Sequence, residues 1–261
     1  MADHTESEIT VADHTIRVLR GGTGPTMLYL HGAGGLAGWA PFMEGLAKSF
    51  DLIVPEHPGF GTGEDPPWLD NIHDEAYFYL SFMEALDLTD VHLVGMSIGG
   101  WLAAEIAVRN TNRLASLTLC GAAGIHVKGV KKGDFFLWKP EERVRNSFHD
   151  QTVADRILAQ PLTEEQQVAH LRNTRTTALL AWSPRLYDPH LYKWLGRIDV
   201  PTHVVWADDD KILPVDYGRE YVQLIPGATL SVIESCGHLM HMEKPAEFAD
   251  TVTAFIAGAD R

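Results

Sequence analysis

The sequence predicts an α/β domain built on a mostly parallel sheet, and two observations carry this prediction. Short apolar segments alternate with longer amphipathic ones along most of the chain, which is typical of strand–helix–strand units joined by right-handed crossovers. Several of the apolar segments are continuous, as in strands that helices cover on both faces. With 261 residues, 45% of them hydrophobic, the chain suits one large domain or one domain with an insertion.

The first 120 residues contain six of the expected strands. The opening pair alternates polar and apolar residues around a turn, which predicts an antiparallel hairpin. The expected strands are 8–11, 15–19, 26–30, 52–54, 91–94 and 114–120. Two helices are expected here, at 74–86, where an apolar face recurs with helical spacing, and at 101–108, which has strong helix formers and no breaker.

The alternation stops between about residues 122 and 197. This segment lacks buried-strand patterns and contains helical ones, one of which begins near Thr163 with Gln166 three residues later, the spacing of a capping box. We therefore expect a core of residues 1–121 and 198–261 with a helical cap inserted at 122–197. We expect most of the cap's aromatic residues to pack within the cap and a few to line an apolar substrate pocket. These aromatic residues are Phe135, Phe136, Trp138, Phe148, Trp182, Tyr187, Tyr192 and Trp194.

The alternation resumes after the insertion. Strands are expected at 202–206 and 228–233. Helices are expected at 214–224, where Pro214 suits a first helical turn, and at 245–256. These segments bring the expected sheet to eight strands.

The composition argues against several classes of partner. Formal net charge is −14, whereas nucleic acids and anionic membranes attract basic patches. The N-terminal residues are acidic and polar, unlike a signal peptide, and no apolar run reaches the length of a transmembrane helix. We expect a cytoplasmic protein, monomeric or homodimeric, that acts on a small molecule. Cys120 and Cys236 are expected to be buried reduced thiols.

Residues 91–101 are the segment around which the chemical motifs are arranged. A strand leads directly into a helix through Gly95-Met96-Ser97-Ile98-Gly99, which matches G-x-S-x-G. Such a turn strains its central residue, and bulky residues two positions away would clash. It would hold the Ser97 hydroxyl at the carboxyl edge of the sheet. Taken alone, the motif also fits an ordinary turn with a capping serine.

Three other loops follow strands at the same edge. The loop His31-Gly32-Ala33-Gly34-Gly35 has little side-chain bulk, so one of its backbone amides can face a ligand oxygen. Residues 208–210 are three aspartates after a strand, and a solvated capping role suits two of them. His238 follows the last strand. The order Ser, Asp, His over successive crossover loops is stronger evidence than any one of the 13 histidines.

These motifs resemble the α/β-hydrolase superfamily over essentially the whole chain. The resemblance rests on His31-Gly32, on residues 95–100 at the elbow, on Asp210 four residues before Pro214, and on Gly237-His238 with Glu243 and Pro245 behind it. It implies an α/β-hydrolase fold, in which helices flank a mostly parallel eight-stranded sheet and a helical cap is inserted.

The resemblance also implies a role for each site residue. Ser97 would be the nucleophile, His238 the general base, and Asp210 the acid that orients the imidazole. The backbone amides of Ala33 and Ile98 would form the oxyanion hole. No metal or organic cofactor is implied.

Two of these assignments have alternatives. Asp209 is a second candidate acid, because Ala207 stands where the family pattern usually begins with glycine. His241 is a second candidate base, although His238 holds the family position.

Three functions are considered. The leading hypothesis is hydrolysis of carboxylic esters with small to medium acyl or aryl groups, through an acyl-enzyme on Ser97. The second is carbon–carbon bond hydrolysis of vinylogous diketones from aromatic breakdown, for which Arg172, Arg175 or Arg185 of the cap could bind the substrate's carboxylate. The third is a non-catalytic ligand-binding protein on a hydrolase scaffold.

Overall fold

Eight strands form one sheet in the computed structural model, which describes residues 3–259. The strands are β1 (His4–Val11), β2 (His14–Gly21), β3 (Thr26–Leu30), β4 (Asp51–Pro55), β5 (Val91–Met96), β6 (Leu114–Cys120), β7 (Thr202–Ala207) and β8 (Thr229–Ile233). Their spatial order is β1-β2-β4-β3-β5-β6-β7-β8. β2 runs antiparallel to both β1 and β4, and all other neighbours are parallel. The predicted hairpin and the predicted mostly parallel sheet are therefore confirmed.

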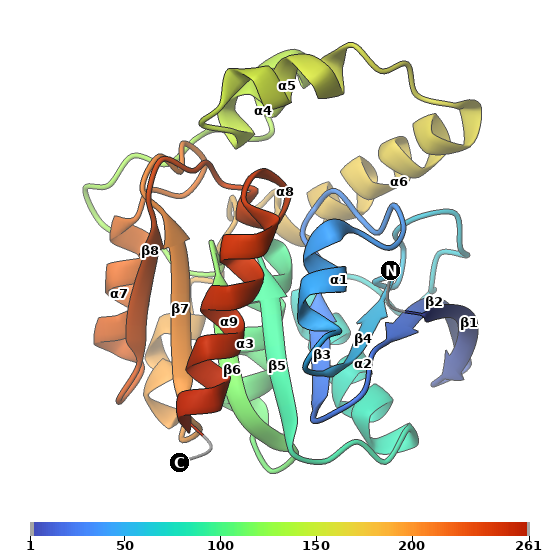
Figure 1. Cartoon of the computed structure of the whole chain (residues 1–261), viewed down its shortest axis with the longest axis vertical. Helices are drawn as coiled ribbons and strands as arrows, with labels where there is room; N and C mark the ends of the chain where they lie inside the picture. Colours follow the sequence, from blue (N-terminus) through green and yellow to red (C-terminus); the bar gives the residue numbers. More distant parts are fainter. Residues whose placement is uncertain (1–2, 260–261) are drawn as a thin grey trace.

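Helices cover both faces of this sheet (Figure 1). One face carries α2 (Ile72–Ala85), α3 (Ile98–Arg109) and α7 (Asp216–Leu224), and the other carries α1 (Pro41–Leu46) and α9 (Pro245–Ala259). Side chains along β3 point to the two faces in turn: Leu28 and Leu30 join the cluster under α2 and α3, while Met27 and Tyr29 join the cluster under α1 and α9. This double burial is the reason why the central strands are continuously apolar.

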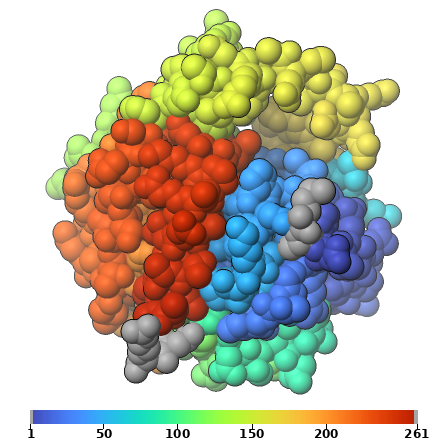
Figure 2. Space-filling view, in the orientation of Figure 1, coloured from blue at the N-terminus to red at the C-terminus, as the bar shows by residue number. Residues whose placement is uncertain are grey.

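The segment between β6 and β7 contains α4 (Pro140–Ser147), α5 (Gln151–Leu158) and α6 (Glu164–Ala181), followed by two short 3-10 helices, η1 (Leu191–Lys193) and η2 (Leu195–Arg197). In Figures 1 and 2, α4, α5 and α6 cross the edge of the sheet where the parallel strands end. The capping box is confirmed, because the Gln166 amide donates to Thr163 Oγ1 over 3.2 Å and the Thr163 amide donates to Gln166 Oε1 over 3.0 Å. The boundaries of the cap as a unit stay a prediction.

The structure differs from the sequence-based expectations in its short elements. The helices α1 and α8 (Met240–Glu243) were not expected, because six and four residues are too few to show an amphipathic period. Helix α3 begins at Ile98, three residues earlier than expected, because tertiary packing overrides the low helix propensity of Gly99 and Gly100. Conversely, α7 begins two residues later than Pro214.

The cap aromatics are distributed differently from the expectation that most form a core of the cap. Phe135, Phe136 and Trp138 pack against the main core cluster of the α2–α3 face, and Phe148 is buried. Trp182 and Trp194 are each about half exposed.

Other expectations concern the thiols and the membrane. Cys120 and Cys236 are both buried and unpaired with one another, as expected. Among the helices of residues 3–259, none has the length and apolar character needed to cross a membrane.

Candidate active site

Ser97 lies at the turn between β5 and α3, in a backbone conformation that is rare for a residue with a side chain. Its φ is +58° and its ψ is −114°. A Cβ on Gly95 would lie 2.2 Å from the Gly99 carbonyl oxygen, and one on Gly99 would lie 2.2 Å from the Leu30 carbonyl oxygen. Both positions therefore require glycine, and this close packing keeps Ser97 in its strained conformation.

His238 connects Ser97 to Asp210. Its Nε2 lies 2.9 Å from Ser97 Oγ, and its Nδ1 lies 2.7 Å from Asp210 Oδ2. Because the carboxylate can only accept, Nδ1–H donates to Asp210, and Nε2 is left to accept the serine proton. The imidazole and the carboxylate are buried, whereas Ser97 is partly exposed. A ligand can therefore reach the hydroxyl, while the groups behind it are shielded from water.

Asp210 is held by the turn that follows β7. Its Oδ1 accepts the backbone amides of Ile212, over 2.9 Å, and Leu213, over 2.8 Å. These bonds leave Oδ2 directed at His238. The alternative acid, Asp209, lies elsewhere: its Oδ2 is 2.9 Å from His149 Nδ1 and 3.2 Å from Lys211 Nζ.

The loop that carries His238 is fixed from behind by Glu243, whose Oε2 accepts the Gly237 amide over 2.7 Å. The alternative base, His241, is partly exposed, and its ring packs at an angle against the rings of Phe42 and Phe248. Burial lowers the pKa of His241 to about 3, so this imidazole is neutral at ordinary pH. The structure brings His238, and not His241, to Ser97.

The two amides expected to form the oxyanion hole, those of Ile98 and Ala33, come from two different segments. Ile98 is the first residue of α3, so its amide has no partner within the helix. Gly32 is packed against the serine, since a Cβ on it would lie 3.3 Å from Ser97 Cβ. Residues 32–35 form a turn closed by the Gly35 amide, which donates to the Gly32 carbonyl over 3.1 Å. Ala33 lies within this turn, and its role in the oxyanion hole stays a prediction.

A buried network that the sequence motifs do not predict supports this turn. His31 Nδ1–H donates to the Gly32 carbonyl over 2.8 Å, and His31 Nε2 accepts the His57 amide over 2.9 Å. His57 Nε2–H donates back to the His31 carbonyl over 2.9 Å, and Tyr79 O–H donates to His57 Nδ1 over 2.6 Å. Burial lowers the pKa of His31 to about 4 and that of His57 well below its usual range. Both rings are therefore neutral, as this pattern of donors and acceptors requires.

The three cap arginines proposed as carboxylate binders are all engaged by acidic side chains. Arg172 Nη2 lies 2.7 Å from Asp65 Oδ1, and Arg175 bonds the other oxygen of Asp65. Arg185 bonds Asp134, and its guanidinium lies 4.6 Å from the centre of the Trp182 ring.

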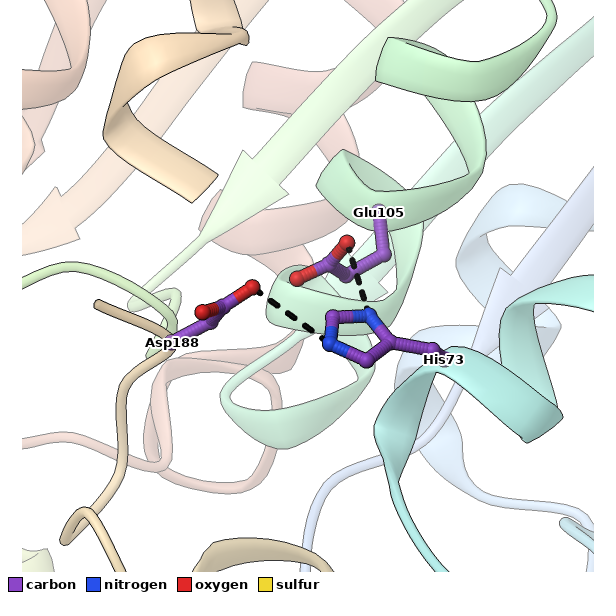
Figure 3. Close-up of side chains that lie close together, drawn as sticks. All are labelled: His73, Glu105 and Asp188. Carbon is purple, nitrogen blue, oxygen red and sulfur yellow. Dashed lines mark ion pairs between the residues drawn. The ribbon is translucent and has the colours of Figure 1, made fainter. Parts of the chain in front are cut away.

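A separate cluster contains residue types that bind metals. His73, Glu105 and Asp188 converge from α2, α3 and the segment after α6 (Figure 3), at a cleft of about 400 Å³. However, the Arg109 guanidinium already occupies this cluster, 2.5 Å from Glu105 Oε2 and 2.8 Å from His73 Nδ1. A metal ion would have to displace that cation, so we interpret the cluster as an ion-pair network that joins three elements.

Comparison with known proteins identifies the family. Residues 27–251 match the family model described as the alpha/beta hydrolase family, and the chain belongs to this family. The expected resemblance and fold are thereby confirmed.

Several relatives have names that describe a more specific activity than the family does. The chain is 29% identical to a 2-hydroxy-6-oxo-6-phenylhexa-2,4-dienoate hydrolase of Comamonas testosteroni, over 93% of this chain and 91% of that protein. It is also 29% identical to a 2-hydroxymuconate semialdehyde hydrolase of a Pseudomonas strain, over 97% and 94%. A solved bacterial membrane phospholipase A superposes with a TM-score of 0.81 at 25% identity, over 99% of this chain and 87% of the other. These comparisons establish a hydrolase.

Proposed function

We propose that this hydrolase uses Ser97 as a nucleophile, His238 as a general base and Asp210 as the group that orients the imidazole. The observation that carries the proposal is the continuous hydrogen-bonded line from Ser97 Oγ through both nitrogens of His238 to Asp210. Serine is a weak nucleophile unless a base takes its proton during attack. His238 is placed to take that proton, and the carboxylate stabilises the imidazolium that results.

The proposed reaction has two halves. Ser97 Oγ bonds to a substrate carbonyl carbon, and the carbonyl oxygen becomes an oxyanion facing the amides of Ile98 and Ala33. The leaving group departs with its electron pair and takes the proton from His238. Water then attacks the acyl-enzyme, with His238 again acting as the base, and Ser97 is released. None of these steps needs a cofactor.

For the substrate, we propose a vinylogous diketone whose carbon–carbon bond is hydrolysed. The relatives named above support this hypothesis over ester hydrolysis, which is the leading hypothesis from the sequence alone. Their names describe hydroxy-oxo-dienoate and semialdehyde hydrolases. Once the enol of such a substrate has become a second ketone, the bond beside the first ketone can break. The departing electron pair delocalises into the conjugated system, and a carboxylic acid and a hydroxydienoate are the products.

Ester hydrolysis is the second candidate, and one observation favours it. Carbon–carbon hydrolysis of a dienoate needs a cation for the substrate's carboxylate, yet Asp65 and Asp134 engage all three proposed arginines. An uncharged ester makes no such demand. The phospholipase that shares 25% identity is in keeping with this candidate.

One experiment separates the two candidates. The protein is mixed with a coloured hydroxy-oxo-dienoate and, separately, with short- and long-chain p-nitrophenyl esters. Loss of the dienoate colour, with an acid and a hydroxydienoate as products, supports the first candidate when the Ser97→Ala variant leaves the colour unchanged. Fast ester turnover without loss of colour supports the second. No turnover and no covalent trapping of Ser97 would favour the ligand-binding hypothesis instead.

The remaining expectations stay predictions. These are the cytoplasmic location and the monomeric or homodimeric state.

A further inference from the structure

One side chain of the cap holds two loops of the core together. Asn173, on α6, donates from Nδ2 to the Gly34 carbonyl over 2.8 Å, and its Oδ1 accepts the Gly61 amide over 2.8 Å. Asn173 is 6% exposed, so its bond to Gly61 is buried and its bond to Gly34 is partly buried. Since one partner is a carbonyl and the other an amide, only this orientation of the Asn173 amide satisfies both.

The first of these loops is the turn of residues 32–35, which contains Ala33. Gly35 has a φ of +77°, and a Cβ on it would lie 2.2 Å from Asn173 Nδ2. The turn is thus packed directly against the asparagine, and glycine is required at the point of contact. The Gly34 carbonyl that Asn173 binds and the Ala33 amide lie two peptide units apart, within the turn that the Gly35 amide closes on the Gly32 carbonyl. A shift of this short turn therefore moves both groups.

The second loop follows β4 and supports the same turn from another direction. It contains Gly61, which Asn173 binds, and His57, whose backbone amide and ring both bond His31. Therefore His57 holds the turn from the core and Asn173 holds it from the cap. The His57 contacts and the Asn173–Gly61 bond are buried, the Asn173–Gly34 bond is partly buried, and together they leave the turn little freedom to move.

We propose that Asn173 is a positioning residue for the reaction: it sets the place of the Ala33 amide in the oxyanion hole and so couples the cap helix α6 to catalysis. This inference rests on the proposed function of Ser97, and it adds a residue that makes no contact with the reacting atoms. The ground-state substrate does not depend on this amide as strongly as the oxyanion does.

The expected effect on the rate follows from the stronger dependence of the oxyanion on the Ala33 amide. Removal of a whole oxyanion donor typically slows a reaction by about 100-fold to 1,000-fold. Displacement of the donor costs less, so we expect the loss of the Asn173 bond to lower kcat by about 10-fold to 100-fold. KM should change by less than about threefold, because the contact acts on the transition state.

The main variant is Asn173→Asp. It has the same shape and keeps an oxygen to accept the Gly61 amide, but it no longer donates to the Gly34 carbonyl. Asn173→Ala is a second variant that removes both bonds without placing a charge in the interior. The matched control is Thr176→Val on the same face of α6, since Thr176 Oγ1 donates to the Gly59 carbonyl over 2.6 Å rather than to a group of residues 32–35.

The measurement is the rate at which a fluorophosphonate labels Ser97. It is combined with kcat and KM for whichever compound the wild type hydrolyses, the hydroxy-oxo-dienoate or a p-nitrophenyl ester, and with the thermal midpoint of each variant. We expect slower labelling and lower kcat in both Asn173 variants, and near-normal values in Thr176→Val at a comparable loss of thermal stability. Equal labelling rates in wild type and a folded Asn173 variant would overturn the inference. So would an equal loss of rate in Thr176→Val, because the effect would then be general to α6 packing.

Failure of the proposed function has a different signature. If wild-type protein is not labelled at Ser97 at all, the nucleophile assignment fails, and the inference fails with it. If wild type is labelled normally and Asn173→Asp is labelled equally fast, only the inference fails.

Discussion

His238 Nδ1 lies 2.7 Å from Asp210 Oδ2, while the other oxygen of Asp210 accepts two backbone amides. The turn after β7 therefore fixes the carboxylate, and the fixed carboxylate holds the orientation of the imidazole. This arrangement distinguishes Asp210 from its neighbour Asp209, which faces His149 and Lys211 near the surface.

Asp210→Asn should lower kcat by about 10,000-fold with little change of fold. Its amide oxygen still accepts the two backbone amides, but its NH₂ group faces His238 and selects the wrong imidazole tautomer. Steady-state kinetics at pH 7.5 provide the measurement. Asp209→Asn is the matched control and should retain activity within about twofold, as its side chain does not reach His238. The opposite ranking of the two variants would reassign the acid.

Gly99→Ala should destabilise the protein by about 3 kcal/mol or more, because the new methyl group would lie against the Leu30 and His31 carbonyls. Gly258→Ala is the control, since nothing lies within 4 Å of its Cβ position in the exposed end of α9. It should stabilise the protein by roughly 0.5–1 kcal/mol. Urea unfolding of both variants tests this, and a stable, active Gly99→Ala protein would contradict the close packing described at the elbow.

Tyr79→Phe should destabilise the protein by about 1–3 kcal/mol, because His57 Nδ1 would be left buried without a donor. Tyr29→Phe is a matched control: this hydroxyl is also buried, and among the described residues it has no hydrogen-bond partner. Its removal should be neutral or stabilising. Chemical denaturation of the two variants gives the comparison, and equal losses would show that the His57–Tyr79 bond contributes nothing of its own.

The free energy of unfolding should fall as the pH drops from 7 to 4.5. Burial lowers the pKa of His31 to about 4 and that of His241 to about 3, so the unfolded chain, with a histidine pKa of about 6.5, binds more protons in this window. His31 alone should contribute a loss of about 2 kcal/mol. Three groups work in the opposite direction: Glu105 raises the pKa of His73, and burial raises the pKa values of Glu56 and Glu75. Against them stand five histidines whose pKa values burial lowers, namely His14, His31, His57, His203 and His241.

His241→Leu provides the control for this pH dependence. It removes an imidazole whose buried Nδ1 has no hydrogen-bond partner in the described part of the chain, so it should reduce the loss of stability between pH 7 and 4.5 without abolishing it. Urea titrations at several pH values measure both slopes. An unchanged slope in His241→Leu would show that this imidazole is protonated as readily when folded as when unfolded.

The sequence predicts the eight strands and the Ser–Asp–His loops because these features are local. Each rests on a short apolar run and on the turn that follows it, such as Gly95–Gly99 after β5. The sequence alone does not decide between Asp209 and Asp210, since both follow the same strand. Only the three-dimensional contacts separate them.

The supporting groups could not be predicted because their contacts are distant in the sequence. Asn173 binds carbonyl and amide groups 139 and 112 residues away. The cap arginines were proposed as carboxylate binders from residue type alone, and Asp65, about 110 residues upstream, engages two of them. Substrate preference depends on the same long-range geometry, and there the relatives favour the carbon–carbon hypothesis over the ester one.

The most direct test of the central claim is to locate a covalent adduct. The protein is treated with a fluorophosphonate, digested, and mapped by mass spectrometry beside the Ser97→Ala variant. We predict one adduct, on Ser97, that is absent from the variant, because only a serine whose proton His238 can accept reacts quickly with this reagent. An adduct that persists in Ser97→Ala, or no adduct on folded wild-type protein, would contradict the assignment of Ser97 as the nucleophile.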